Sequence, residues 1–179
     1  FRKEDDFTPG GVNDRRPDRA CIAYTNLIKR HIKGSPIILA GIEASLRRIA
    51  HYDFWSDSVR RSILFDSKAD ALVYGMGELT NLDLARRIQA GEDWRDAYGI
   101  CRIESSPPPE CSVIPSYEEV SDRSDRRPFM KAYSIFRKNS DPKTALPLCQ
   151  RHGDRWLVQN RPRRCMTSEE LDSAYGSSF

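Results

Sequence analysis

Short apolar runs that end in glycine turns recur through the first hundred residues. Ile37–Leu39 and Ala71–Tyr74 are two such runs, and the turn after each opens a segment with apolar residues at helical spacing. Neither run alternates with polar residues, which is typical of strands buried on both faces. Because strand, glycine turn and helix repeat in this order, we expect an α/β fold with a Rossmann-like parallel sheet. Ligands of such sheets bind at the carboxyl ends of the strands.

The same pattern predicts further elements. Ala20–Tyr24 and Ile100–Ile103 are expected to be strands. Helices are expected at Thr25–Lys33, Glu43–Ala50, Val59–Leu64 and Leu82–Ala90. Around the second of these helices, Ile42 and Leu46 are expected to face the core. Residues 51–58, which join it to the third helix, are predicted to form a loop.

Proline and charge content divide the chain. Three consecutive prolines in segment 104–111 favour an extended, stiff linker. We therefore expect an N-terminal loop, a Rossmann-like domain, a Pro-rich linker and an irregular α+β extension, at residues 1–19, 20–103, 104–111 and 112–179. In the extension, Leu146–Gln150 and Arg155–Gln159 predict a small hairpin. Thr167 and Glu170 form a capping-box pattern that predicts a helix after them.

The two glycine turns at the strand ends are candidate ligand-facing segments. They contribute Gly41, Glu43 and Ser45, and Gly75, Gly77 and Glu78. A helix that starts after a strand offers free backbone N–H groups to an anion, although tight packing of strand on helix explains the same glycines. Position 80 is Thr, so the second turn lacks the third glycine of the dinucleotide fingerprint, which argues against NAD.

An aromatic and acidic cluster follows the first of these turns. His51, Tyr52, Asp53 and Trp55 lie within five residues of one another. Such a cluster suits a pocket for a flat ligand, because rings supply contact area and polar groups supply orientation. A loop that packs its rings on the edge of the sheet explains it equally well. No nucleophile, base and orienting residue can be assembled from the sequence, so no catalytic residue is predicted.

Arginines occur in adjacent pairs along the chain. The pairs are Arg15–Arg16, Arg47–Arg48, Arg60–Arg61, Arg86–Arg87, Arg126–Arg127 and Arg163–Arg164. Neighbouring helical residues point about 100° apart, so a pair covers a broad solvated face. Binding of phosphate or RNA by some of the pairs is the alternative. The net charge of +3 is weak evidence for a polyanionic partner.

The cysteines and the hydropathy exclude several classes. The five cysteines match no zinc, Cys-x-x-Cys or iron–sulfur spacing, so no metal site is expected in this chain. No apolar stretch approaches the roughly 20 residues of a membrane span. No membrane partner is expected, and the expected location is the cytoplasm. The chain begins at Phe1, and we expect it to be a piece of a longer protein.

Several long segments resemble one known family. They are PGG at 9–11, RPDRA at 16–20, GIEASLRRIAHYDFW at 41–55, SVRRSIL at 58–64, DSKADALVYGMGE at 66–78, QRHGDRWLVQN at 150–160 and EELDSAY at 169–175. In this order they are similar to the N-terminal region of the YgiQ family of radical SAM iron–sulfur proteins. The match is poorest between residues 92 and 141.

The resemblance implies a modular protein. A Rossmann-like domain of the cobalamin-binding type would precede a radical SAM barrel, which holds a 4Fe-4S cluster on a Cys-x3-Cys-x2-Cys motif and cleaves S-adenosylmethionine. Neither that motif nor the Asp-x-His-x-x-Gly signature of cobalamin ligation occurs here, and the family's usual Gly-Gly is Ala40–Gly41. None of the five cysteines is therefore assigned to the cluster.

The resemblance also implies a role. We expect an accessory domain, not catalytic by itself, that packs against the barrel of the same polypeptide and shapes or covers its substrate opening. Arg47 and Arg48 are expected to contact an anionic substrate there. Two alternatives stay open: an RNA-binding accessory module that uses the arginine pairs and the aromatic cluster, and a structural interdomain module without a ligand.

Overall fold

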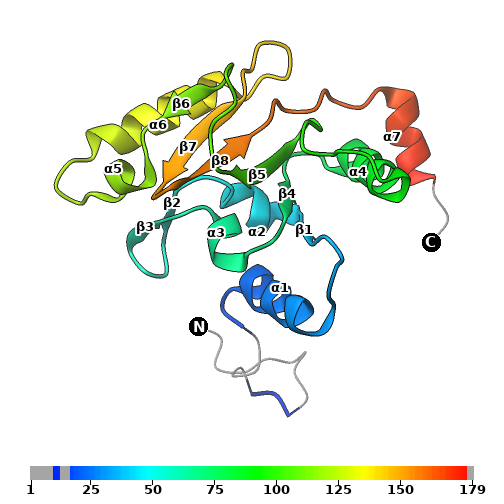
Figure 1. Ribbon diagram of the computed structural model, residues 1–179, viewed down its shortest axis with the longest axis horizontal. Helices are drawn as coiled ribbons and strands as arrows, with labels where there is room; N and C mark the ends of the chain where they lie inside the picture. The colour runs from blue at the N-terminus through cyan, green and yellow to red at the C-terminus, as the bar shows by residue number, and fades with distance from the viewer. Residues whose placement is uncertain (1–9, 13–16, 177–179) are drawn as a thin grey trace.

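A six-stranded mixed sheet forms the centre of the computed structural model, which describes residues 10–12 and 17–176 (Figure 1). The strands, in spatial order, are β1 (Ile38–Leu39), β4 (Ala71–Val73), β5 (Ile100–Glu104), β8 (Arg155–Gln159), β7 (Leu148–His152) and β6 (Ser112–Ile114). The β1–β4 and β6–β7 pairs are parallel, and the other three pairs are antiparallel. The predicted α/β class is confirmed, but the prediction of a parallel sheet is wrong.

The sheet is mixed because the chain does not cross over between β4 and β5. After β4, the chain runs through α4 (Glu78–Ala90) and then returns to the carboxyl end of the same strand. There the Tyr74 N–H donates to the Gly99 carbonyl over 2.9 Å. Strand β5 therefore starts where β4 ends, and the two run in opposite directions.

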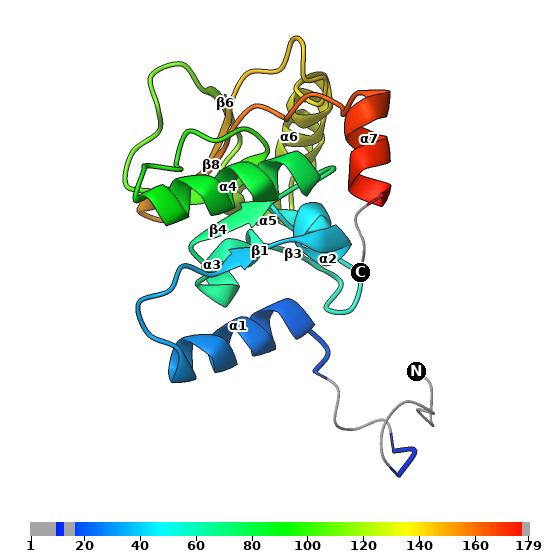
Figure 2. The same cartoon turned by 90° about the vertical axis from the view of Figure 1, so that its right-hand side faces the viewer.

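Helices cover both faces of the sheet. The remaining helices are α1 (Ala20–His31), α2 (Gly41–Leu46), α3 (Ile63–Ser67), α5 (Tyr117–Ser121), α6 (Arg127–Lys138) and α7 (Ser168–Tyr175). Helices α1, α2 and α3 lie on one side of β1 and β4, and α4 lies on the other (Figure 2). Leu72 packs toward the first group in a core with Leu64 and Leu157. Its neighbour Val73 packs toward α4 with Leu84. This alternation is expected of a strand buried on both faces.

Three local predictions between residues 20 and 64 are wrong. Ala20–Tyr24 begins helix α1 and is not a strand. Residues 51–58 form a hairpin of β2 (His51–Asp53) and β3 (Ser58–Arg60) and not a loop. Helix α3 begins only at Ile63, because Ser62 caps it by accepting from the Leu64 N–H, whereas the helix was expected from Val59.

The second half of the chain completes the same sheet. The predicted hairpin is confirmed as β7 and β8, and the predicted capping box at Thr167 and Glu170 is confirmed before α7. Strand β8, which follows the Pro-rich segment in sequence, pairs with β5, which precedes it. The division into domains at 104–111 stays a prediction, and most of the expected loop 1–19 lies outside the described residues.

A buried glutamine joins two parts of the fold that are distant in sequence. The Gln150 amide oxygen accepts from the Ala50 N–H over 2.8 Å, and its nitrogen donates to the Pro115 carbonyl over 2.9 Å. We expect Gln150→Leu to lower the free energy of unfolding by about 2 kcal/mol, because both backbone groups lose their partner. Urea unfolding would measure this loss. Gln89→Leu on the exposed side of α4 is the control and should change stability by less than about 0.5 kcal/mol; equal losses would contradict the role of Gln150.

Candidate functional site

The carboxyl ends of three strands meet at one edge of the sheet. Strands β1 and β4 are parallel. Strand β5 is antiparallel to both β4 and β8, so β8 runs in the same direction as β1 and β4. A cavity of about 360 Å³ opens at this edge. Of the predicted ligand-facing residues, Ser45, Arg48 and Gly75 line it. These three residues therefore lie together at strand ends, and their contact with a ligand stays a prediction.

Turn geometry places these residues at the edge. Gly41 and Gly75 follow β1 and β4 with φ of 86° and 74°, in the left-handed region that favours glycine. Gly41 starts helix α2, on which Ser45 lies. Arg48 follows the end of this helix, and its side chain turns back to the Ser45 carbonyl, so both residues reach the cavity. Gly41 and Glu43 are not among the residues that line the cavity.

Arg48 is held on several sides. Its Nε donates to the Gln159 amide oxygen over 2.9 Å, and its Nη1 donates to the Ser45 carbonyl. The guanidinium carbon lies 4.6 Å from the ring centroids of both Tyr74 and Phe136. Cation–π contacts on two rings fix the guanidinium without neutralising it. Gln159 and Phe136 were not predicted as site residues, because β8 and α6 lie about a hundred residues away in sequence.

Arg47 points elsewhere, so the expected Arg47–Arg48 pair does not act together. Its guanidinium lies 3.1 Å from Glu43 and 3.9 Å from Asp53. Asp53 is buried and accepts two hydrogen bonds from Arg19, of 3.0 and 2.8 Å. The Arg19 guanidinium, helped by Ser56, holds the pKa of Asp53 well below its usual range. This network fixes the start of α1 and the end of α2 to the hairpin, and it was not expected from sequence.

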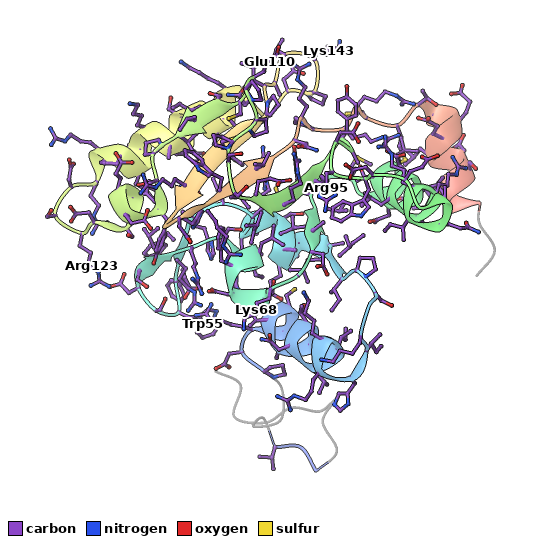
Figure 3. The ribbon with its side chains drawn as sticks, in the orientation of Figure 1. Trp55, Lys68, Arg95, Glu110, Arg123 and Lys143 are labelled. Atoms are coloured by element: carbon purple, nitrogen blue, oxygen red, sulfur yellow. The ribbon has the colours of Figure 1, made fainter. Side chains whose placement is uncertain are left out.

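The predicted aromatic cluster does not gather in one pocket. Burial lowers the pKa of His51, whose Nδ1 lies 3.1 Å from the Ile49 carbonyl. The Tyr52 hydroxyl donates to Asp57 and lines a second cavity of about 340 Å³ beside α5. Trp55 is exposed in the turn of the hairpin, and Arg123, whose side chain donates to the Asp57 carbonyl, is also at the surface (Figure 3). The cluster is therefore divided between structural and surface positions.

Within the second glycine turn, Gly77 contributes packing, whereas Gly75 lines the cavity. A Cβ at Gly77 would lie 3.0 Å from the Val73 side chain, so the strand and helix approach closely there. Glu78 is exposed in the first turn of α4. Neither Gly77 nor Glu78 lines the cavity.

The described residues do not fit a metal or cluster site. Within residues 10–12 and 17–176, no three His, Cys, Asp or Glu side chains lie together as a ligand set. Cys101 and Cys149 are buried, Cys21 and Cys111 are half-buried, and Cys165 is exposed. Burial raises the pKa of Cys21 to about 11 and of Cys101 to about 12, so neither forms a thiolate near neutral pH. The helices that the structure describes include none with the length and apolarity of a membrane span.

A comparison with known protein families shows to which family this chain belongs. The family described as radical SAM N-terminal matches residues 1–179, the entire sequence. The chain belongs to the radical SAM N-terminal family. The resemblance seen in the sequence is thereby confirmed: this is an N-terminal domain of the radical SAM type.

Relatives of this radical SAM N-terminal domain are longer proteins. A UPF0313 protein of Fusobacterium nucleatum is 46% identical over 99% of the chain, which covers 31% of that relative. UPF0313 proteins of Thermotoga maritima and Geobacter sulfurreducens are 46% and 44% identical over 97% and 100% of the chain, covering 31% and 30% of their length. The chain thus spans less than a third of the curated relatives it matches. No solved structure matches it.

Proposed function

We propose that this domain packs against the radical SAM barrel of the same polypeptide and covers or shapes the opening of that barrel. One observation carries the proposal. Helix α1 exposes Tyr24, Leu27 and Ile28, and Ile32 follows at the end of the helix; these four side chains, here called the α1 stripe, are 41–55% exposed. The spacing of Tyr24, Leu27 and Ile28 places these three on one side of the helix.

The α1 stripe adjoins the side of the helix that packs on the domain. On the inner side, Cys21 and Ile22 pack against the core formed with α3 and the sheet. Figures 1 and 2 show α1 at one end of the molecule, with no other labelled element on its outer side. A contiguous exposed apolar surface is a common mark of an interface, since its burial yields about 25 cal/mol per Å².

The length of the relatives supports the choice of partner. The relatives extend well beyond the matched third, and a domain that precedes a barrel has that barrel as its nearest partner in the same chain. The resemblance implies that the whole protein holds a 4Fe-4S cluster and S-adenosylmethionine, which supply radical chemistry. Their ligands are expected outside the described residues of this chain, since these do not fit a cluster. The cytoplasm remains the proposed location.

The structure does not favour the RNA-binding alternative. Arg60 and Arg61 both bind Asp66, at 2.7 and 2.6 Å. Arg127 binds Asp125, and Arg164 binds Glu170. Carboxylates thus neutralise much of the charge that the arginine pairs would offer to phosphates. The structural interdomain alternative differs from our proposal only in giving the domain no influence on the barrel opening.

Substitution of the α1 stripe tests the proposal. In the full-length protein, Leu27→Glu with Ile28→Glu should speed limited proteolysis between domain and barrel by about tenfold or more, because two buried charges weaken the contact by several kcal/mol. In this chain alone the two substitutions should leave the melting temperature nearly unchanged, because both side chains are exposed.

A matched control lies on another helix. Met130 and Tyr133 are exposed on α6 to a similar degree, three residues apart. Met130→Glu with Tyr133→Glu should leave the proteolysis rate of the full-length protein unchanged. Equal rates for both double variants would refute docking through the α1 stripe.

A further inference from the structure

The cavity at the strand ends is surrounded by cations and lacks anions. Arg48, Arg163 and Arg164 line it together with the amides of Asn139 and Gln159, and no Asp or Glu is among its lining residues. Its volume of about 360 Å³ lies at the lower end of the range of small-molecule sites. The cavity therefore suits a compact ligand that carries negative charge.

The three arginines differ in the charge they have available. Arg163 binds Asp83 at 3.0 Å, and Arg164 binds Glu170 at 2.6 Å, so carboxylates outside the cavity already balance both. Arg48 has no carboxylate partner among the residues that the structure describes. Its contacts are the neutral Gln159 amide, the Ser45 carbonyl and two rings, and its Nη2 has no hydrogen-bond partner within the described chain. One half-buried positive charge thus faces the cavity without a counter-charge.

Neighbouring groups hold the Arg48 guanidinium in place without a ligand. Gln159 is almost completely buried, and the Tyr74 hydroxyl is fixed by donating to the Asn160 carbonyl over 2.6 Å. The guanidinium that these groups support needs little reordering to bind an oxyanion, and a planar guanidinium matches carboxylate and phosphate oxygens. Met76 and Pro162 add apolar contact area to the same cavity.

We propose that this cavity binds a small organic oxyanion, a carboxylate or a phosphate monoester, with its charged group on Arg48 and its apolar body against the remaining wall. The proposal is independent of the α1 stripe, because none of the four stripe residues lines the cavity. It replaces the expected Arg47–Arg48 pair by Arg48 alone.

Calorimetry and ligand-observed NMR on the full-length protein test this site. The probes are benzoate and phenyl phosphate, with benzamide as the neutral analogue of similar shape. We expect saturable binding of at least one anion with a Kd on the order of 1 mM or tighter, and at least about tenfold weaker binding of benzamide. Tighter binding of benzoate would assign the site to carboxylates, and tighter binding of phenyl phosphate would assign it to phosphate monoesters.

Variants locate the binding. Arg48→Gln should abolish saturable anion binding, whereas Arg155→Gln should not, since Arg155 also lies over a ring, that of Phe65 at 5.3 Å, but outside the cavity. Should Arg48→Gln fail to fold, the comparison of anion with benzamide on the unmodified protein still decides. No saturable binding of either anion up to about 10 mM, ten times the expected Kd, would overturn the proposal. So would benzamide binding as tightly as benzoate, or unchanged affinity in Arg48→Gln.

Discussion

Replacement of Asp53 by Asn should lower the free energy of unfolding by about 3 kcal/mol. The side chain of Asp53 is only 1% exposed, and it forms a two-bond ion pair with Arg19 at 3.0 and 2.8 Å. Asn keeps the shape but removes the charge, so Arg19 is left beside a neutral amide in a poorly solvated position. The Ser56 hydroxyl, which donates to Asp53 over 2.6 Å, also loses a charged acceptor.

Chemical denaturation of Asp53→Asn and Asp125→Asn measures this effect. Asp125 pairs with Arg127 on the surface at 2.8 Å, and Arg127 is 90% exposed there. An exposed pair contributes under about 1 kcal/mol, so Asp125→Asn should be nearly neutral. Similar losses in the two variants would show that the Asp53 network does not anchor α1 to the hairpin.

Acid should destabilise the fold through His152. Its ring stacks on Phe65 with a centroid distance of 4.4 Å and on Tyr117 at 5.5 Å. The ring Nε2 lies 3.3 Å from the Gln150 amide oxygen, an acceptor, so Nε2 carries the proton of the neutral form. Burial lowers the pKa of His152 to about 4, from an ordinary value of 6.5.

The sign of the effect follows from proton binding. Between pH 6.5 and 4 the unfolded chain binds a proton at this histidine and the folded chain does not, so the free energy of unfolding falls as the pH falls. The full loss is about 3 kcal/mol, is complete below pH 4, and is absent above pH 7. The lowered pKa of His51 acts in the same direction.

Two measurements check the role of His152. NMR titration of its ring should give a pKa near 4, and urea unfolding at pH 7.5 and pH 4.5 should show a smaller pH dependence in His152→Gln than in the unmodified protein. A ring that titrates near pH 6.5, or a pH dependence that the substitution leaves unchanged, would contradict burial of the neutral imidazole.

The sequence pattern located the strands better than it located their directions. The apolar runs at 37–39, 71–74 and 100–103 all contain strands, because buried strands need such runs whichever way they point. The direction of a strand depends on where the preceding connection returns to the sheet. Before β5 the chain returns at Gly99, which is hydrogen-bonded to Tyr74 at the end of β4, and hydropathy does not predict this contact. Short runs also fail to separate helix from strand, as at Ala20–Tyr24, where the helix continues to His31.

The helix faces show why an interface is hard to predict. Ile42 and Leu46 were expected to point inward, but they are 79% and 68% exposed on α2. Apolar periodicity reports that a face avoids water and does not report whether the covering surface lies in the same domain. For the same reason, the exposure of the α1 stripe could not be predicted from the sequence.

The cavity residues that were predicted from the sequence all come from the first half of the chain. Ser45, Arg48 and Gly75 follow from the rule that ligands meet strand ends, and they do line the cavity. Gln159 and Phe136 come from the second half of the chain, and their approach to Arg48 required the pairing of β8 with β5. Arg47 points away from Arg48 because it lies near the buried Asp53. The residues next to Asp53 in the sequence do not indicate that it is buried.

Hydrogen exchange measured by mass spectrometry on this chain and on the full-length protein tests the proposed docking most directly. Peptides that cover Ala20–His31 should exchange at least about tenfold more slowly in the full-length protein, because the proposed docking covers the α1 stripe and stabilises the helix. Peptides of α6 should exchange at the same rate in both. Equal exchange of α1 in the two proteins would contradict packing of this face against the barrel.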